Sequence, residues 1–233
     1  MAAVAFAMRV SIGPVLVSGP TDVAVSNMAS RIMSVSKIIC ADYNRDLDKD
    51  SGSRMRHWLA VRGTRTADDY LAFVYLLQNQ DAREVPRRVF RGPSCWQLPL
   101  SPTYWLLMAL GARVPGVPGL HSDASRVLYD LRECMRANDV YEPLLSVATG
   151  KTTWEESGIA ASGSKLTKGV VMKLLDTLGE EADMLCVTPA RAENFVDFRV
   201  FKHSRAKCIV VDEAGAMRIP DLMSVWVSFA FDV

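Results

Sequence analysis

Lys207-Cys-Ile-Val-Val-Asp-Glu-Ala-Gly215 is the stretch that decides the fold. Its β-branched centre, residues 209–211, is typical of a strand buried on both faces of a parallel sheet. The strand ends in two carboxylates, Asp212 and Glu213, and then in small residues that let a ligand approach closely. Because ligands of open α/β sheets bind beyond the carboxyl ends of the strands, the pair indicates a magnesium ion with bound phosphates. The same pattern also fits a buried strand with a solvated end.

The composition is that of an ordinary globular chain. Of its 233 residues, 49% are hydrophobic and 23% are charged, and the formal net charge is +1. A polyanion site must therefore be a local patch of charge. The five cysteines are odd in number and form no Cys-x-x-Cys motif, which indicates a reducing compartment and predicts an intracellular, nuclear or cytoplasmic protein.

The N-terminal residues 1–8 are apolar and precede Arg9. A basic region and a cleavage-like site are lacking, so we expect a buried helix over residues 1–9 rather than a signal peptide. No segment approaches the ~20 apolar residues of a membrane span, and we expect no membrane partner.

Strands and helices alternate at both ends of the chain, which indicates an α/β fold. In the first part we predict strands over residues 14–18 and 58–62, a helix from about Thr21 to about Met33, and an exposed loop over residues 41–55. In the last part we predict strands over residues 182–189 and 207–213. The division is therefore 1–63 and 181–233 for an α/β core, and 64–180 for a mostly helical insertion.

The insertion has one clear helix and several ambiguous motifs. Ser164 to Leu178 has a single apolar stripe, with Ser164 as its cap and Gly179 at its end. Arg83, Arg87, Arg88 and Arg91 lie near Phe90 and Trp96, a pattern typical either of single-strand binding or of a solvated proline-rich connection, and we favour the second. Gly150-Lys-Thr152 and Gly163-Ser-Lys165 resemble the end of a phosphate-binding loop but lack its first glycine and its strand, so we interpret both as turns.

Three predicted strands end in polar or turn-prone residues: Gly19-Pro-Thr21, Thr188-Pro189 and Asp212-Glu213. In a parallel sheet these ends meet at one edge. There Thr21 and Thr188 present hydroxyls, and the helix after Thr21 presents backbone N–H groups, which are the groups that contact nucleic-acid phosphates. A nucleic-acid-driven nucleoside triphosphatase needs such contacts beside its metal-binding acids.

Three segments resemble motifs of superfamily 1 helicases of the nonsense-mediated-decay type. Residues 19–27 resemble motif Ia, residues 182–190 motif Ic, and residues 211–215 motif II, which is the Walker B motif. The resemblance implies a RecA-like P-loop NTPase core. It also implies that Asp212 binds the magnesium of Mg–ATP, that Glu213 activates the hydrolytic water, and that Pro20, Thr21 and Thr188 line the path of single-stranded DNA or RNA.

Two features depart from that family. Asp22 stands where the family usually has Asn, and Ser26 stands where Asp is common. The matching segments begin after the position of the family's P-loop and end soon after motif II, so we expect a partial helicase domain that does not hydrolyse ATP alone. A non-catalytic nucleic-acid-binding or interaction module that retains this fold is the alternative.

Overall fold

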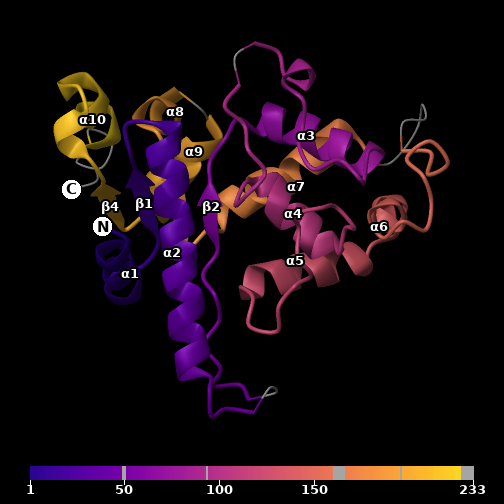
Figure 1. Ribbon diagram of the computed structural model, residues 1–233, viewed down its shortest axis with the longest axis horizontal. Coiled ribbons are helices and arrows are strands. Elements are labelled where there is room, and N and C mark those ends of the chain that lie inside the picture. Colours follow the sequence, from indigo (N-terminus) through magenta and orange to yellow (C-terminus); the bar gives the residue numbers. More distant parts are fainter. Residues whose placement is uncertain (49–50, 93, 160–165, 195, 227–233) are drawn as a thin grey trace. The chain divides into compact units, whose positions relative to one another are not determined.

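The computed structural model describes residues 1–48, 51–92, 94–159, 166–194 and 196–226 (Figure 1). The chain forms two compact units. Unit 1 comprises Met1–Arg65 and Gly179–Val233, and unit 2 comprises Thr66–Leu178. Unit 1 contains every strand of the described part of the chain and all the segments that resemble helicase motifs.

Unit 1 is built on a four-stranded sheet in which every pair of neighbours is parallel, with the order β2-β3-β1-β4. The strands are β1 (Val15–Ser18), β2 (Ala60–Arg62), β3 (Met184–Val187) and β4 (Cys208–Val211). β1, β2 and β3 are fully buried, whereas β4, at the end of the order, is partly exposed. The predicted α/β fold with a parallel sheet is confirmed.

Two crossovers join these strands in opposite directions. α2 (Asp22–Tyr43) leads from β1 to β2, while α8 (Pro189–Asn194), α9 (Val196–Val200) and the π-helix η3 (Phe201–Arg205) lead from β3 to β4. Parallel crossovers are almost always right-handed, so opposite directions place α2 on one face of the sheet and α8 and α9 on the other (Figure 1). The direction reverses between the neighbours β1 and β3, which makes their carboxyl ends the topological switch point.

α2 is ten residues longer than the sequence predicted, because it continues past Met33 to Tyr43. The polar residues after Met33 suggested an end, but Ser36 is buried and its Oγ accepts a hydrogen bond of 3.0 Å from the Trp58 backbone N–H. Beyond the helix, the Asn44 side chain exchanges two hydrogen bonds of 2.8 Å with the Met55 backbone. The exposed loop therefore starts at Asn44 instead of residue 41.

α1 (Ala2–Ser11) is a helix, as predicted, but it is not buried: within it only Ala5 is buried. Its Phe6 ring stacks on Trp58 at 3.9 Å. Its Arg9 pairs with Asp183, whose second carboxylate oxygen accepts a hydrogen bond of 2.7 Å from Leu59 N–H. The alanines and the apolar residues of this segment predicted the helix. Arg9, which interrupts the apolar run, attaches the helix to Asp183.

The regular elements in the described residues of unit 2 are all helices. Its elements are α3 (Thr66–Gln78), η1 (Arg87–Val89), α4 (Pro102–Leu110), α5 (Arg126–Arg136), η2 (Asp139–Tyr141), α6 (Glu142–Ala148) and α7 (Lys168–Glu180), which extends two residues into unit 1. The predicted stop at Gly179 is therefore wrong, since α7 runs through it. The predicted cap Ser164 and the Gly163-Ser-Lys165 turn lie outside the described residues.

A buried carboxylate organises one end of unit 2. Asp69 is 0% exposed and accepts hydrogen bonds from Trp96 Nε1 at 2.9 Å and from Thr103 Oγ1 at 3.1 Å. Phe90 is buried and packs on Trp96 with ring centroids 5.8 Å apart. Both aromatic rings of the arginine-rich segment are thus used in packing, and its four arginines are exposed beside them.

The second phosphate-loop look-alike also lies in unit 2. Gly150 has φ +70° in the turn that follows α6, so Gly150-Lys-Thr152 ends a helix instead of joining a strand to one. No helix of the described part of the chain is long and apolar enough to cross a membrane.

Candidate functional site

The carboxyl ends of three strands lie side by side at one edge of the sheet. In the register of the sheet, Ser18 of β1 pairs with both Val187 of β3 and Val211 of β4. The segments that follow therefore start at the same level. This places Pro20 and Thr21, Thr188, and the Asp212–Glu213 pair at one edge, as the sequence predicted.

The loop after β1 is tight and ends in a helix cap. A Cβ added to Gly19 would lie 3.3 Å from Ala24 Cβ, so the loop passes close to the first turn of α2. Thr21 Oγ1 accepts a hydrogen bond of 3.1 Å from Ala24 N–H. A hydroxyl has one proton and two lone pairs, so Thr21 can cap α2 and still donate to a ligand oxygen.

Arg191 ties the loops after three strands together. Its Nη1 lies 2.5 Å from Asp22 Oδ1 and donates a hydrogen bond of 3.3 Å to the Gly63 carbonyl. Arg191 lies in α8. The backbone N–H groups of Arg191 and Ala192 each donate a hydrogen bond of 3.0 Å to the Thr188 carbonyl. The carboxylate of Asp22, the departure from the family pattern, is therefore paired with a cation inside the site.

The loop after β4 adopts an unusual backbone. Asp212 N–H donates a hydrogen bond of 2.8 Å to the Ser18 carbonyl, which extends the ladder by one residue. Glu213 then has φ 53° and ψ 37°, the left-handed conformation that favours glycine, and its side chain is exposed. Such outliers are concentrated at functional sites because the surrounding structure must maintain them.

The edge fits one of the two implied cofactors. Magnesium in a nucleotide site takes one or two carboxylates and completes its shell with phosphates and waters, so the partly exposed Asp212 suits it. No group of three or more His, Cys, Asp or Glu that could hold a metal ion occurs in the described residues. The described residues also contain no Gly-Lys-Thr loop between a strand and a helix, so they provide no cradle for the phosphates of ATP.

A cavity of about 290 Å³ opens at the switch point between β1 and β3. Its walls come from the loop after β1, from the start of α8, and from the chain that runs from η4 (Ala214–Ala216) into α10 (Ile219–Trp226). The lining residues are Pro20, Thr21, Pro189, Ala190, Ala216, Met217, Arg218 and Asp221. Pro20 and Thr21 thus line the cavity, whereas Thr188, Asp212 and Glu213 lie next to it in sequence without lining it.

A buried lysine fixes the far wall of the cavity. Lys202 on η3 is 1% exposed, and its Nζ donates a hydrogen bond of 2.6 Å to the Ser224 carbonyl of α10. α10 also packs against α8.

The sequence analysis did not predict Arg218 and Asp221 as site residues, although both line the cavity. The available signal was two opposite charges three residues apart at the start of a helix.

Two buried side chains, those of Cys186 and Ser18, lie in the strands beneath this edge. Burial raises the pKa of the Cys186 thiol to about 12, although the neighbouring Arg62 guanidinium acts in the opposite direction. The thiol is therefore neutral at physiological pH and packs as an apolar group. The Ser18 hydroxyl is buried and has no hydrogen-bond partner among the described residues.

Comparison with known protein families, with curated proteins and with solved structures finds no match to this chain.

Proposed function

We propose that unit 1 is part of a RecA-like helicase domain of superfamily 1 and binds single-stranded nucleic acid along the carboxyl edge of its sheet. In the intact family, ATP hydrolysis drives movement along the strand. The observation that supports this most is the common register of β1, β3 and β4, which brings all three motif-like segments to one edge.

The local geometry suits phosphate contacts. Thr21 keeps a hydroxyl proton for an acceptor, and the 22-residue helix α2 begins beside it with the partial positive charge of its N-terminus. Asp22 would repel phosphate if it stood alone, but Arg191 pairs with it. The departure at position 22 is therefore compatible with a phosphate path.

Binding of the full chain to a fluorescent single-stranded oligonucleotide tests the proposal. We expect measurable binding at low salt that weakens steeply as salt rises, because phosphate contacts release counterions. Thr21→Val removes a donor and should weaken binding about threefold to tenfold, whereas Thr21→Ser should retain it. Absence of binding at low salt would exclude a nucleic-acid role.

The same preparation tests the expected lack of catalysis. Without a phosphate cradle, we expect no ATP hydrolysis stimulated by nucleic acid, in the wild type or in Glu213→Gln. Stimulated hydrolysis that disappears in Glu213→Gln would contradict this expectation and assign the catalytic role to Glu213 in this chain.

The second candidate is a non-catalytic nucleic-acid-binding or interaction module with the same fold. Weak Mg–ATP binding that is lost in Asp212→Asn, measured by calorimetry, supports the helicase proposal. Binding of single strands with no detectable Mg–ATP binding supports the module.

A further inference from the structure

The cavity at the switch point combines groups of opposite chemical character. Arg218 and the Thr21 hydroxyl offer donors to an anion, and Pro20, Pro189 and Met217 offer apolar surface. Asp221 contributes a carboxylate, which can only accept hydrogen bonds when ionised. A ligand that fits must therefore present an anionic group and a hydrogen-bond donor close together.

Asp221 is the informative member of this set. Its backbone carbonyl accepts a hydrogen bond of 2.8 Å from Ser224 Oγ. Its side chain is exposed, and no ion pair with it occurs among the described residues. Asp22, the acid that follows Thr21, is paired with Arg191. Asp221 is thus the acid of the cavity that remains for a ligand.

The size of the cavity limits what can enter. At about 290 Å³ it lies at the small end of ligand pockets, which span about 300–1,000 Å³. One nucleotide unit fits this space, with its phosphate at Arg218 and Thr21 and its sugar or base on the apolar wall. A carboxylate beside the phosphate path repels the strand unless the sugar offers it a proton, and the ribose 2′-hydroxyl is such a donor.

We propose that this cavity is a ribonucleotide subsite, in which Arg218 and Thr21 bind a backbone phosphate and Asp221 accepts a hydrogen bond from the ribose 2′-hydroxyl. The inference rests on the proposed function and adds to it that the strand is RNA. Asp221 discriminates RNA from DNA, because deoxyribose offers its carboxylate no 2′-hydroxyl donor.

Equilibrium binding to three oligonucleotides of equal length and sequence tests the inference: oligo(U), oligo(dU) and 2′-O-methyl oligo(U). We expect the full chain to bind oligo(U) about tenfold more tightly than either of the others, because neither has a 2′-proton to donate. Asp221→Ala should lower RNA affinity to the level of DNA and leave DNA affinity unchanged or higher. Arg218→Ala should weaken RNA and DNA equally and reduce the salt slope by about one.

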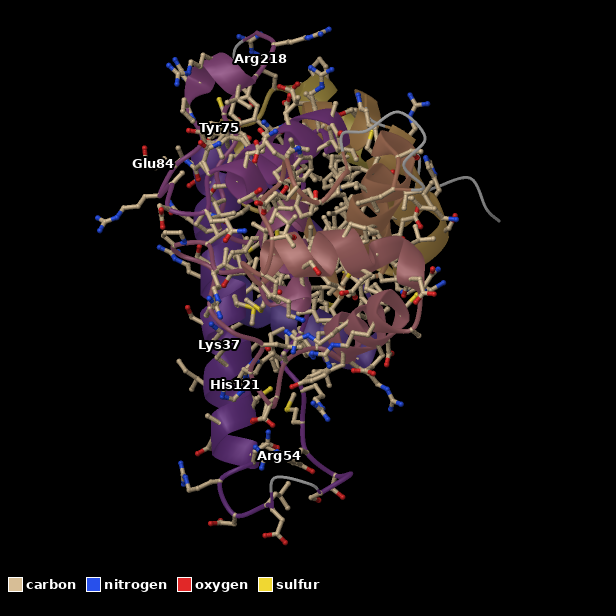
Figure 2. The ribbon with its side chains drawn as sticks, turned by 90° about the vertical axis from the view of Figure 1, so that its right-hand side faces the viewer. Lys37, Arg54, Tyr75, Glu84, His121 and Arg218 are labelled. Atoms are coloured by element: carbon tan, nitrogen blue, oxygen red, sulfur yellow. The ribbon has the colours of Figure 1, made fainter. Side chains whose placement is uncertain are left out.

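Two exposed residues away from the cavity serve as matched controls. Figure 2 shows Arg218 at one end of unit 1, Arg54 beyond the other end of α2, and Lys37 between them. Lys37→Ala removes one positive charge as Arg218→Ala does, and Asp46→Ala removes one negative charge as Asp221→Ala does. Neither control should change the RNA-to-DNA ratio, and thermal unfolding of each variant shows whether the protein is still folded.

The outcomes separate the two proposals. Equal binding of all three oligonucleotides, or an RNA preference that survives Asp221→Ala in a folded variant, overturns the ribose inference and leaves the nucleic-acid proposal intact. No binding of any oligonucleotide at low salt overturns both. A DNA preference lost in Asp221→Ala also overturns the inference, because it gives the carboxylate the opposite role.

Discussion

Glu213 combines a position at the proposed metal edge with a backbone that its residue type disfavours. A left-handed conformation costs a residue with a Cβ about 1–2 kcal/mol relative to the right-handed one. The strained conformation is maintained by the hydrogen bond from Asp212 N–H to the Ser18 carbonyl and by the 3₁₀ turn that follows. The carboxylate is therefore held at the edge by backbone geometry rather than by side-chain contacts.

Substitutions at Glu213 should separate the contribution of the backbone conformation to stability from that of the side chain. Glu213→Gly should raise the free energy of unfolding by up to about 1 kcal/mol, since glycine adopts this conformation without strain but loses more entropy on folding. Glu213→Ala should have little effect because the strain remains, and Glu213→Val should destabilise. Chemical denaturation of the three variants measures the order, and identical midpoints would show that the turn relaxes in solution.

At the scale of elements, one ion pair joins the helices that follow β1 and β3, beyond the backbone pairing of the two strands. Arg191 of α8 and Asp22 of α2 come from helices on opposite faces of the sheet, and their side chains are only 18% and 27% exposed. Salt screens a partly buried pair less than an exposed one. The pair therefore links the starts of α2 and α8, next to Thr21 and Pro189 of the cavity lining.

A double-mutant cycle of Asp22→Ala and Arg191→Ala should give a coupling energy of about 1 kcal/mol, at the upper end of the range for exposed pairs. The exposed pair of Asp42 and Arg45, at 68% and 71% exposure, is a control in the same unit and should give a value near zero. Urea denaturation measures both cycles. Equal coupling in the two cycles would contradict a structural role for the inner pair.

The elements themselves could be predicted from the sequence to different degrees. The strands were placed because β-branched and apolar runs ended at turn residues, as in residues 209–213. The end of α2 was missed because Ser36 looks polar in sequence, whereas in the structure its hydroxyl is used by the Trp58 backbone. The cavity wall was missed because Lys202 positions α10 through a contact between segments that no local spacing reveals.

At the scale of the whole molecule, the chain comprises two units with cores of their own. The described side chains in the core of unit 2 include Phe73, Leu76, Leu106, Leu107, Leu128 and Leu144, all 0–1% exposed. Asp69 joins α3, the Trp96 segment and α4 through hydrogen bonds inside that unit. A unit with a closed core and internal polar contacts is expected to fold independently.

Residues 66–180 expressed alone should therefore give a helical circular dichroism spectrum and a cooperative thermal transition. Asp69→Ala should lower its stability by about 1–3 kcal/mol, because Trp96 Nε1 and Thr103 lose their buried acceptor. Asp130→Ala, which removes a 70% exposed carboxylate of α5, is the matched control and should change it little. A spectrum of unfolded chain for the wild-type segment would show that unit 2 depends on unit 1.

The ion pair of Asp22 and Arg191 also has an evolutionary consequence. An acid at position 22 is compatible with the proposed phosphate path only while a cation at position 191 neutralises it, so the two positions constrain each other's mutations. Loss of Arg191 leaves a charge that weakens the site, and a change of Asp22 to Asn releases position 191 to vary. Descendants of this sequence should therefore keep both residues, or lose Asp22 before they lose Arg191.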